Sequence, residues 1–311
     1  MEKGIVSILG HRKTKSTVEK AASVIFTCCA VVSIVAVISI TGYMFISGTP
    51  AIFKVGITEI LFSQVWSPTA SNPQFGILNI ILTSIVGVFL AICIGVPIGI
   101  LTAVNLAEIA NPKVRKIVKS AVELLAGIPS VVYGLLGILI ICPLMYQLEL
   151  LIFANSTTHQ FTGGSNLISA ILVLTIMILP TLINITETAL NTVPDDYRKS
   201  SLALGASQIQ TIFKVVLPAA KNGIMSAIVL GVGRAIGEAM AILLVAGNSV
   251  NVPLPFNSVR FLTTGIVSEM GYAAGLHREV LFTIGLVLFV FIIAINLILT
   301  FILKGGNQDG K

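Results

Sequence analysis

The chain has 311 residues, of which 55% are hydrophobic and only 10% are charged. Soluble domains carry about 25% charged residues, so this composition excludes an ordinary soluble fold, and the apolar content excludes intrinsic disorder. Four cysteines in a chain of this length also exclude a small secreted scaffold held by disulfides. The composition therefore predicts an integral membrane protein.

Six apolar stretches are long enough to cross a bilayer, for which a helix needs about 20 apolar residues. The first follows a basic segment and is too long for the apolar core of a secretory signal, so we expect it to be retained. The second contains Pro97, which favours a kink or a tilt. The sequence predicts an all-α integral membrane protein with six transmembrane helices, at 21–46, 76–107, 121–146, 167–190, 222–246 and 280–303.

The basic residues are distributed unevenly between the loops that these helices would connect. Fifteen of the nineteen Lys and Arg residues fall on one side, Lys54, Arg260 and Arg278 fall on the other, and Arg234 lies within the fifth stretch. Basic loops stay in the cytoplasm, so both termini are expected inside. The net charge of +6 then reflects topology rather than nucleic-acid binding. The expected divisions are a cytoplasmic tail at 1–20, a first helix at 21–46, a transmembrane domain at 76–303 and a cytoplasmic tail at 304–311.

Motifs for catalysis are missing from the sequence. The Gly-Lys pair occurs only at Gly310–Lys311, so there is no phosphate-binding P-loop. His11, His159 and His277 are scattered, no His/Cys cluster has zinc spacing, and no Gly-x-Ser-x-Gly elbow is present. We therefore expect no catalytic residue, no metal site and no bound cofactor, and we do not expect an enzyme.

The cytoplasmic loop at 191–221 contains two predicted short helices. Pro194, followed by two aspartates, favours a helix start, because Pro fits the first turn and acids favour the positive end of the helix dipole. Gly205 is expected to turn the chain, and Ser207 with Gln210 has the spacing of a capping box. The pattern indicates either a docking element or an interfacial helix on lipid headgroups. The second helix carries apolar residues at helical spacing and runs to Leu217-Pro218; they are Ile209, Ile212, Phe213 and Val216.

Two charges, Arg234 and Glu238, lie within the fifth apolar stretch. Each charge costs about 2.5–3.5 kcal/mol near the bilayer centre on insertion scales, so such residues usually mark a substrate path. Arg offers a planar fork of donors that suits oxyanions such as phosphate. We interpret Arg234 as a transient contact for an anion and Glu238, four residues on, as the group that pairs with its guanidinium. A self-satisfied salt bridge is the alternative. Gly233 and Gly237 have the spacing at which another helix can approach closely.

The loop resembles that of a known family. Gly205, followed after nine residues by Val215-x-Leu217-Pro218, is similar to the loop motif of binding-protein-dependent ABC importer permeases. The family pattern is Glu-Ala-Ala, three residues, Gly, nine residues and Ile-x-Leu-Pro, and this chain has Lys199-Ser200-Ser201 in place of Glu-Ala-Ala. In that family the loop docks onto a separate ATPase, so we refer to 191–221 as the coupling loop. The resemblance implies contact with the ATPase through Asp195, Lys199, Ser200, Ser201, Gly205, Ala206, Val215, Leu217 and Pro218.

The segments 127–134 and 231–248 further resemble the PstC-type permease subunits of bacterial phosphate ABC importers, and the likeness extends over most of 76–303. It implies import of phosphate across the cytoplasmic (inner) membrane by alternating access, with Arg234 and Glu238 on the path. The implied partners are a second permease of the PstA type, an ATPase dimer of the PstB type that binds ATP and Mg, and an external phosphate-binding protein of the PstS type. The residues leave open a permease for sulfate or molybdate, an ion-coupled secondary transporter and a structural scaffold.

Three further features carry expectations about local structure. Gly127-Ile128-Pro129 is expected to break or bend the third helix near its cytoplasmic side. Glu187, near the cytoplasmic end of the fourth helix, is expected to anchor to Lys119 or Lys221. Glu269, in the longest external loop, is expected on a solvated face.

Overall fold

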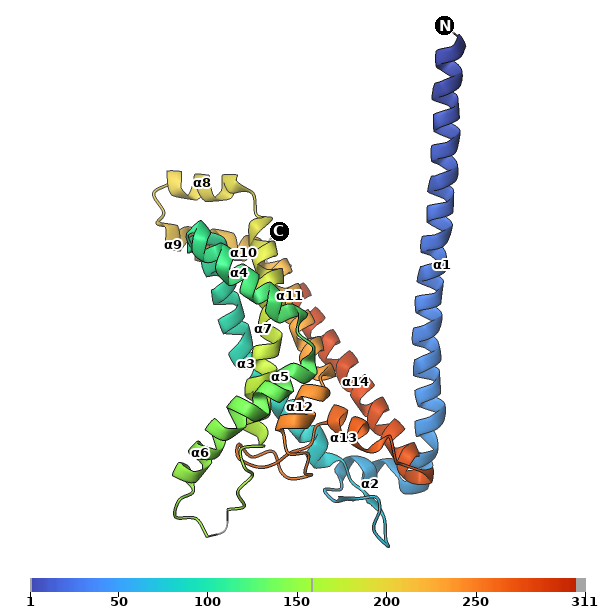
Figure 1. Cartoon of the computed structure of the whole chain (residues 1–311), viewed down its shortest axis with the longest axis vertical. Helices are drawn as coiled ribbons and strands as arrows, with labels where there is room; N and C mark the ends of the chain where they lie inside the picture. The colour runs from blue at the N-terminus through green and yellow to red at the C-terminus, as the bar shows by residue number, and fades with distance from the viewer. Residues whose placement is uncertain (1, 158, 306–311) are drawn as a thin grey trace.

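The computed structural model describes residues 2–157 and 159–305, and most of them are helical (Figure 1). Within these residues, five helices are long and apolar enough to cross a membrane. A sixth crossing exists if Gln208–Ala219 and Lys221–Gly237, which meet at 70°, form one bent span. The all-α membrane fold is therefore confirmed, whereas the prediction of six regular spans is correct only if this bent pair is counted.

Two short strands, β1 and β2, pair in an antiparallel hairpin, with Trp66 opposite Phe75. The segments labelled η are π-helical turns, in which one extra residue is inserted into a helix. In chain order the elements are α1 (Glu2–Val55), α2 (Ile57–Phe62), β1 (Trp66–Ser67), β2 (Gln74–Phe75), α3 (Leu78–Val104), η1 (Asn105–Ile109), α4 (Pro112–Gly127), α5 (Ser130–Leu136), η2 (Gly137–Ile141), α6 (Cys142–Ile152), α7 (Leu167–Asn191), α8 (Asp195–Ala203), α9 (Gln208–Thr211), η3 (Ile212–Val216), α10 (Leu217–Ala219), α11 (Lys221–Gly237), α12 (Met240–Val245), α13 (Leu262–Glu269) and α14 (Gly275–Gly305).

Helix α7 is the centre of the bundle and the most buried of the long apolar helices. It packs along α3 on one side and along α11 on another. Gly99 allows α3 to approach α7 closely. A Cβ atom at this position would lie only 2.8 Å from the Cβ atom of Leu182 on α7, so a larger residue would push the two helices apart. This close contact fixes α3 against α7 between the two ends of the molecule.

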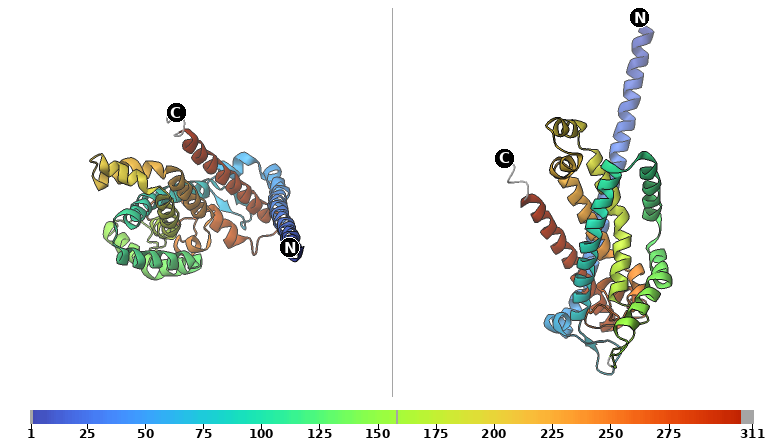
Figure 2. Two further views of the ribbon diagram at one scale, coloured as in Figure 1. Left: turned by 90° about the horizontal axis from the view of Figure 1, so that it is seen from above. Right: turned by 90° about the vertical axis from the view of Figure 1, so that its left-hand side faces the viewer.

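Helix α1 is longer than the first predicted span at 21–46. It runs without interruption over Glu2–Val55, so residues 2–20, which were expected to form a separate tail, continue the helix. It meets α14 near its C-terminal end, where the Thr283 hydroxyl donates to the Gly48 carbonyl at 2.8 Å. Toward its N-terminal end it diverges from the bundle and stands at one edge of the molecule (Figures 1 and 2). Residues 306–311 of the predicted C-terminal tail lie outside the described residues.

The third predicted span, at 121–146, is divided into two helices. Helix α4 ends at Gly127 and α5 begins at Ser130, while Ile128 between them has extended backbone, with ψ 130°. A residue before proline avoids the helical region, which explains the break. The predicted break is confirmed, but the membrane-spanning part lies later than predicted, over Ser130–Ile152. Helix α4 is a separate element, begun by Asn111, whose side chain accepts from the Val114 amide at 2.9 Å.

The fifth predicted span, at 222–246, is not one helix either. Helix α11 ends at Gly237, Glu238 has extended backbone (φ −72°, ψ 132°), and α12 begins at Met240. The Glu238 carboxylate accepts from the Ala241 amide at 2.8 Å and so caps the first turn of α12. The Thr263 hydroxyl donates to the Glu238 carbonyl at 2.6 Å, which satisfies a backbone group that the break would otherwise leave free.

Candidate functional site

Arg234 lies on α11, thirteen residues after Lys221 and so about 20 Å along the helix axis. Its side chain is half-buried, and its Nη1 donates to the Thr181 hydroxyl on α7 at 3.2 Å. Among the described residues, no carboxylate forms an ion pair with it. Most of the five N–H donors of the guanidinium therefore have no acceptor among the described residues.

The predicted pairing of Glu238 with Arg234 is wrong. Residues four apart share a face only while the helix continues, and α11 ends at Gly237, before Glu238. The Glu238 side chain is 9% exposed and is engaged with the α12 backbone instead. The structure thus separates the two charges: Arg234 faces α7, whereas Glu238 holds the break between α11 and α12.

Gly233 and Gly237 lie beside Arg234 on α11. A Cβ atom at either position would meet no described atom within 4 Å. The described chain therefore leaves α11 uncovered at these two positions, whereas Val232, Ala235 and Ile236 beside them are buried.

The coupling loop has the local structure that its sequence predicted. Helix α8 begins at Asp195, and Gly205 has φ +86°, a left-handed conformation that glycine adopts without steric cost. The capping box at α9 is complete, since the Gln210 amide donates to the Ser207 hydroxyl at 3.2 Å and the Ser207 amide donates to the Gln210 side chain at 2.9 Å. Ala206 follows the turn, and its amide donates to the Ser201 carbonyl at 3.2 Å.

The end of the loop agrees with the prediction to within one residue. The second helix was expected to run to Leu217-Pro218, and it continues through η3 and α10 to Ala219, where the chain bends by 70° into α11. Pro218 follows the π-helical turn η3 directly and cannot donate a backbone hydrogen bond to the preceding turn, which fits a helix that ends one residue later. Val215 and Leu217 are half-buried and Pro218 is exposed.

The outer surface of the coupling loop is rich in exposed apolar side chains. Helix α8 has no buried residue, and Lys199 and Ser200 are exposed, whereas Ser201 is half-buried and its hydroxyl lies 2.9 Å from that of Thr211. The apolar residues predicted at helical spacing on the second helix divide between core and surface: Ile212 and Val216 are buried, and Ile209 and Phe213 are exposed. The exposed apolar side chains of the loop are Tyr197, Leu202, Leu204, Ile209 and Phe213.

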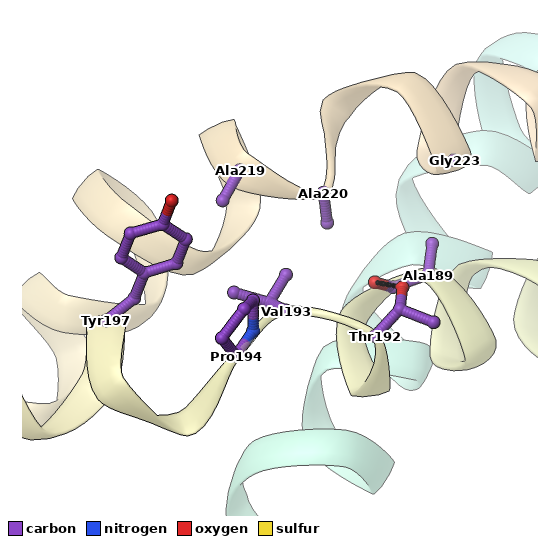
Figure 3. A pocket seen from close by; sticks show the side chains of 8 residues that line it. All are labelled: Ala189, Thr192, Val193, Pro194, Tyr197, Ala219, Ala220 and Gly223. Atoms are coloured by element: carbon purple, nitrogen blue, oxygen red, sulfur yellow. Dashed lines mark hydrogen bonds between the residues drawn. The ribbon is translucent and has the colours of Figure 1, made fainter.

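A small cavity of about 220 Å³ separates the two arms of the loop. It lies between the end of α7, the first turn of α8 and the junction of α10 with α11 (Figure 3). Tyr197 stands on one side of it and Ala219 and Ala220 on the other, with Val193 and Pro194 between them. No charged side chain lines it, so it offers no cation to an anionic ligand.

Two residues that the sequence did not single out, Arg198 on the coupling loop and Glu108 outside it, form an extensive polar contact at this end. Arg198 donates from Nη2 to the Glu108 carboxylate on η1 at 2.6 Å and from Nη1 to the Val193 carbonyl at 2.7 Å. The Glu108 carboxylate, by its hydrogen bonds and charge, raises the pKa of Arg198. Their positions alone could not reveal the contact, because 90 residues separate them.

Of the predictions for two other acidic residues, the one for Glu187 is confirmed and the one for Glu269 is wrong. Glu187 is buried and binds Lys119, as predicted, together with Arg115, at 3.2 and 3.0 Å. Glu269 was expected on a solvated face, and this is wrong: its side chain is 6% exposed. It accepts from Arg260 Nη1 and lies 2.7 Å from His277 Nε2.

A second carboxylate, Glu149, is fully buried. It lies 2.8 Å from His159 Nε2 and accepts from the Thr162 amide at 2.9 Å. His159 and His277 thus each contact a buried carboxylate, which ties the segments that carry them to the helices.

The fold and this loop define a class of protein, which comparison with known proteins identifies. Residues 95–305 match the family of binding-protein-dependent transport system inner membrane components. The chain belongs to this family and is a permease subunit of an ABC transporter. The prediction from the loop motif is confirmed, and the alternatives of a secondary transporter and a scaffold are set aside.

Among curated relatives, the chain is 36% identical to the probable ABC transporter permease protein YqgH of Bacillus subtilis (strain 168), over 91% of this chain and 90% of that protein. It is 34% identical to the phosphate transport system permease protein PstC of Pasteurella multocida (strain Pm70), over 74% and 75%. The resemblance to PstC-type permeases is thus confirmed for most of the chain.

Solved structures share the fold. A bacterial alginate ABC transporter in complex with its alginate-bound periplasmic protein matches with a TM-score of 0.55 and 16% identity, over 86% of this chain and 92% of that chain. An inward-facing MetNI methionine ABC transporter matches with a TM-score of 0.50 and 23% identity, over 74% and 94%. At these identities the likeness concerns the fold alone.

Proposed function

We propose that this chain is the PstC-type permease of an ATP-driven importer that carries inorganic phosphate across the cytoplasmic membrane by alternating access. The observation that supports the substrate class is Arg234, a half-buried cation on α11 whose one described hydrogen bond is to the neutral hydroxyl of Thr181. An anion that enters the bundle would restore local neutrality and fill the free donors of the guanidinium.

One arginine without a carboxylate partner suits the transient binding that transport requires better than it suits tight binding of the anion. Proteins that hold an oxyanion tightly surround it with many donors, and such a site would release it slowly. Arg234 would provide one forked contact, and the Thr181 hydroxyl beside it can exchange its hydrogen bond for one to the anion. Arg234 therefore acts as a transient binding site for the anion on the path. Glu238 maintains the helix break that ends α11 just beyond Arg234.

The coupling loop is the proposed contact with the ATPase. Its exposed apolar residues, together with the exposed Lys199 and Ser200, form a surface with no described partner in this chain. ATP and Mg would be bound by a PstB-type dimer, because this chain has no P-loop. A PstA-type permease would complete the path, and a PstS-type protein would deliver phosphate from outside, with both termini of this chain in the cytoplasm.

A permease for sulfate or molybdate is the second candidate, because one guanidinium suits any tetrahedral oxyanion. The experiment is uptake of labelled phosphate at micromolar concentration by cells with and without this chain, in the presence of a large excess of sulfate or molybdate. Uptake that requires the chain and ignores both competitors supports the proposal. Uptake that does not depend on the chain, in cells without another phosphate importer, would refute the phosphate assignment.

A further inference from the structure

We propose that Glu108 and Arg198 form a strut that carries the movement of the coupling loop to α3. This inference deepens the proposed function, since it rests on a separate ATPase moving the loop. It assigns Glu108 as a positioning residue for transport, although Glu108 lies outside the loop.

The first step of the argument is how weakly α8 is held by packing. No residue of α8 is buried, and the cavity beneath its first turn separates it from α10 and α11. A helix without buried apolar surface gains little from the hydrophobic effect, so polar contacts must position it. Among the described residues, these contacts come from Arg198, Ser201 and the chain ends of α8.

The second step is where those contacts lead. The Ser201 hydroxyl meets Thr211, which belongs to the same loop, so this contact only joins the two arms. Arg198 leaves the loop: its Nη2 donates to the Leu190 carbonyl at the end of α7 at 3.0 Å, and its Nε and Nη2 both donate to the Glu108 carboxylate. The guanidinium thus links α8 to two different helices of the bundle.

The third step is that both arms of the loop converge on Glu108. While Arg198 on α8 binds its carboxylate, the Gln208 side chain on α9 donates to its backbone carbonyl at 3.2 Å. Glu108 lies on η1, the π-helical turn that ends α3, and its side chain is 9% exposed. A shielded, forked Arg–carboxylate pair resists separation, so a displaced loop should take the end of α3 with it.

The fourth step is that α3 can pass the displacement on. It packs along α7 at Gly99, and the Ser84 hydroxyl near its other end accepts from the Leu262 amide, at the start of α13, at 2.9 Å. The Thr263 hydroxyl on α13 holds the Glu238 break. A continuous set of contacts therefore runs from the coupling loop through α3 to the helix break beyond Arg234.

The test uses the complete importer, reconstituted in vesicles, with Glu108→Ala as the main variant. Phosphate transported per ATP hydrolysed is expected to fall at least about fivefold, the lower range of coupling between sites, while ATP hydrolysis stays within about twofold of the wild type. Arg198→Ala is expected to give a similar loss, and the double variant to lose little more, because both remove one contact. The control is Glu123→Ala, which removes an exposed carboxylate from α4.

Nitroxide pairs in a cysteine-free background provide a readout that does not involve phosphate. Labels at Leu204 and Val290 report the loop relative to α14, and labels at Leu101 and Val290 report α3; all three side chains are more than half exposed. ATP should change both distances in the wild type but only the loop distance in Glu108→Ala. An α3 distance that still changes in Glu108→Ala, or an unchanged transport-to-ATP ratio, would overturn the strut. If the wild type shows both distance changes yet no phosphate uptake, the substrate assignment fails and the strut stands.

Discussion

Two side chains of opposite charge four residues apart normally share a helix face, yet Arg234 and Glu238 have separate partners. Arg234 donates to Thr181, and Glu238 caps α12. The sequence could locate both charges, because an ionisable residue in an apolar stretch is conspicuous. It could not assign their partners, since these depend on a break in the helix that the apolar pattern does not reveal.

Glu269 shows the same limit of prediction from sequence. Its place in a loop predicted solvent exposure, but Arg260, His277 and Trp66, from three different segments, all contact its carboxylate. A buried carboxylate of this kind is recognisable only once the segments are packed together.

Glu269→Gln is therefore expected to destabilise the protein strongly. Removing one partner from a buried ion pair costs about 3–5 kcal/mol, because the other charge, here on Arg260, stays buried without compensation. The measurement is the thermal unfolding midpoint of the purified protein in detergent, with Glu59→Gln, on an exposed residue of α2, as the control. Equal midpoints for the two variants would show that the cluster contributes nothing to stability.

At the scale of elements, local chemistry decided which predictions succeeded. The break between α4 and α5 and the capping box of α9 were predictable, because proline and Ser-x-x-Gln act on their immediate neighbours. The break at Glu238 was not, because it is held by Thr263 on α13, which is distant in the sequence. The length of α1 was underestimated, since the helix continues past the apolar stretch through the polar residues at either end.

Glu238→Ala and Glu238→Gln should separate the capping role from the charge of Glu238. Loss of an N-terminal cap costs about 0.5–2 kcal/mol, whereas Gln keeps an oxygen that can accept from the Ala241 amide. Hydrogen exchange of the α12 peptide should thus accelerate in Glu238→Ala and change little in Glu238→Gln. Acceleration of equal size in both variants would indicate that the carboxylate charge, rather than the cap, holds the break.

At the scale of the whole molecule, the distribution of basic residues predicts which end faces the cytoplasm. Helices α8 and α9 lie at the same end as the start of α1 and the last turns of α14 (Figure 1). A shared end agrees with both termini and the coupling loop lying on one side of the membrane, which the basic residues predict to be the cytoplasmic side.

Cysteine labelling in intact cells tests this orientation. In a cysteine-free background, a membrane-impermeant thiol reagent should label Tyr272→Cys, at an exposed external position, and should not label Ser200→Cys until the cells are opened. Labelling of Ser200→Cys in intact cells would reverse the orientation and would remove the coupling loop from the reach of any cytoplasmic ATPase.

The most direct test of the proposed function is phosphate transport by Arg234→Gln in the reconstituted importer, measured beside ATP hydrolysis and complex assembly. We expect transport to fall at least about tenfold, the effect of losing one charge-assisted hydrogen bond of about 1.5 kcal/mol, with assembly unchanged. Arg234→Lys, which keeps the charge without the fork, should transport at an intermediate rate. Arg278→Gln, on an exposed external arginine, is the control and should match the wild type. Normal transport by Arg234→Gln would contradict the account and leave Arg234 as a structural residue that binds Thr181.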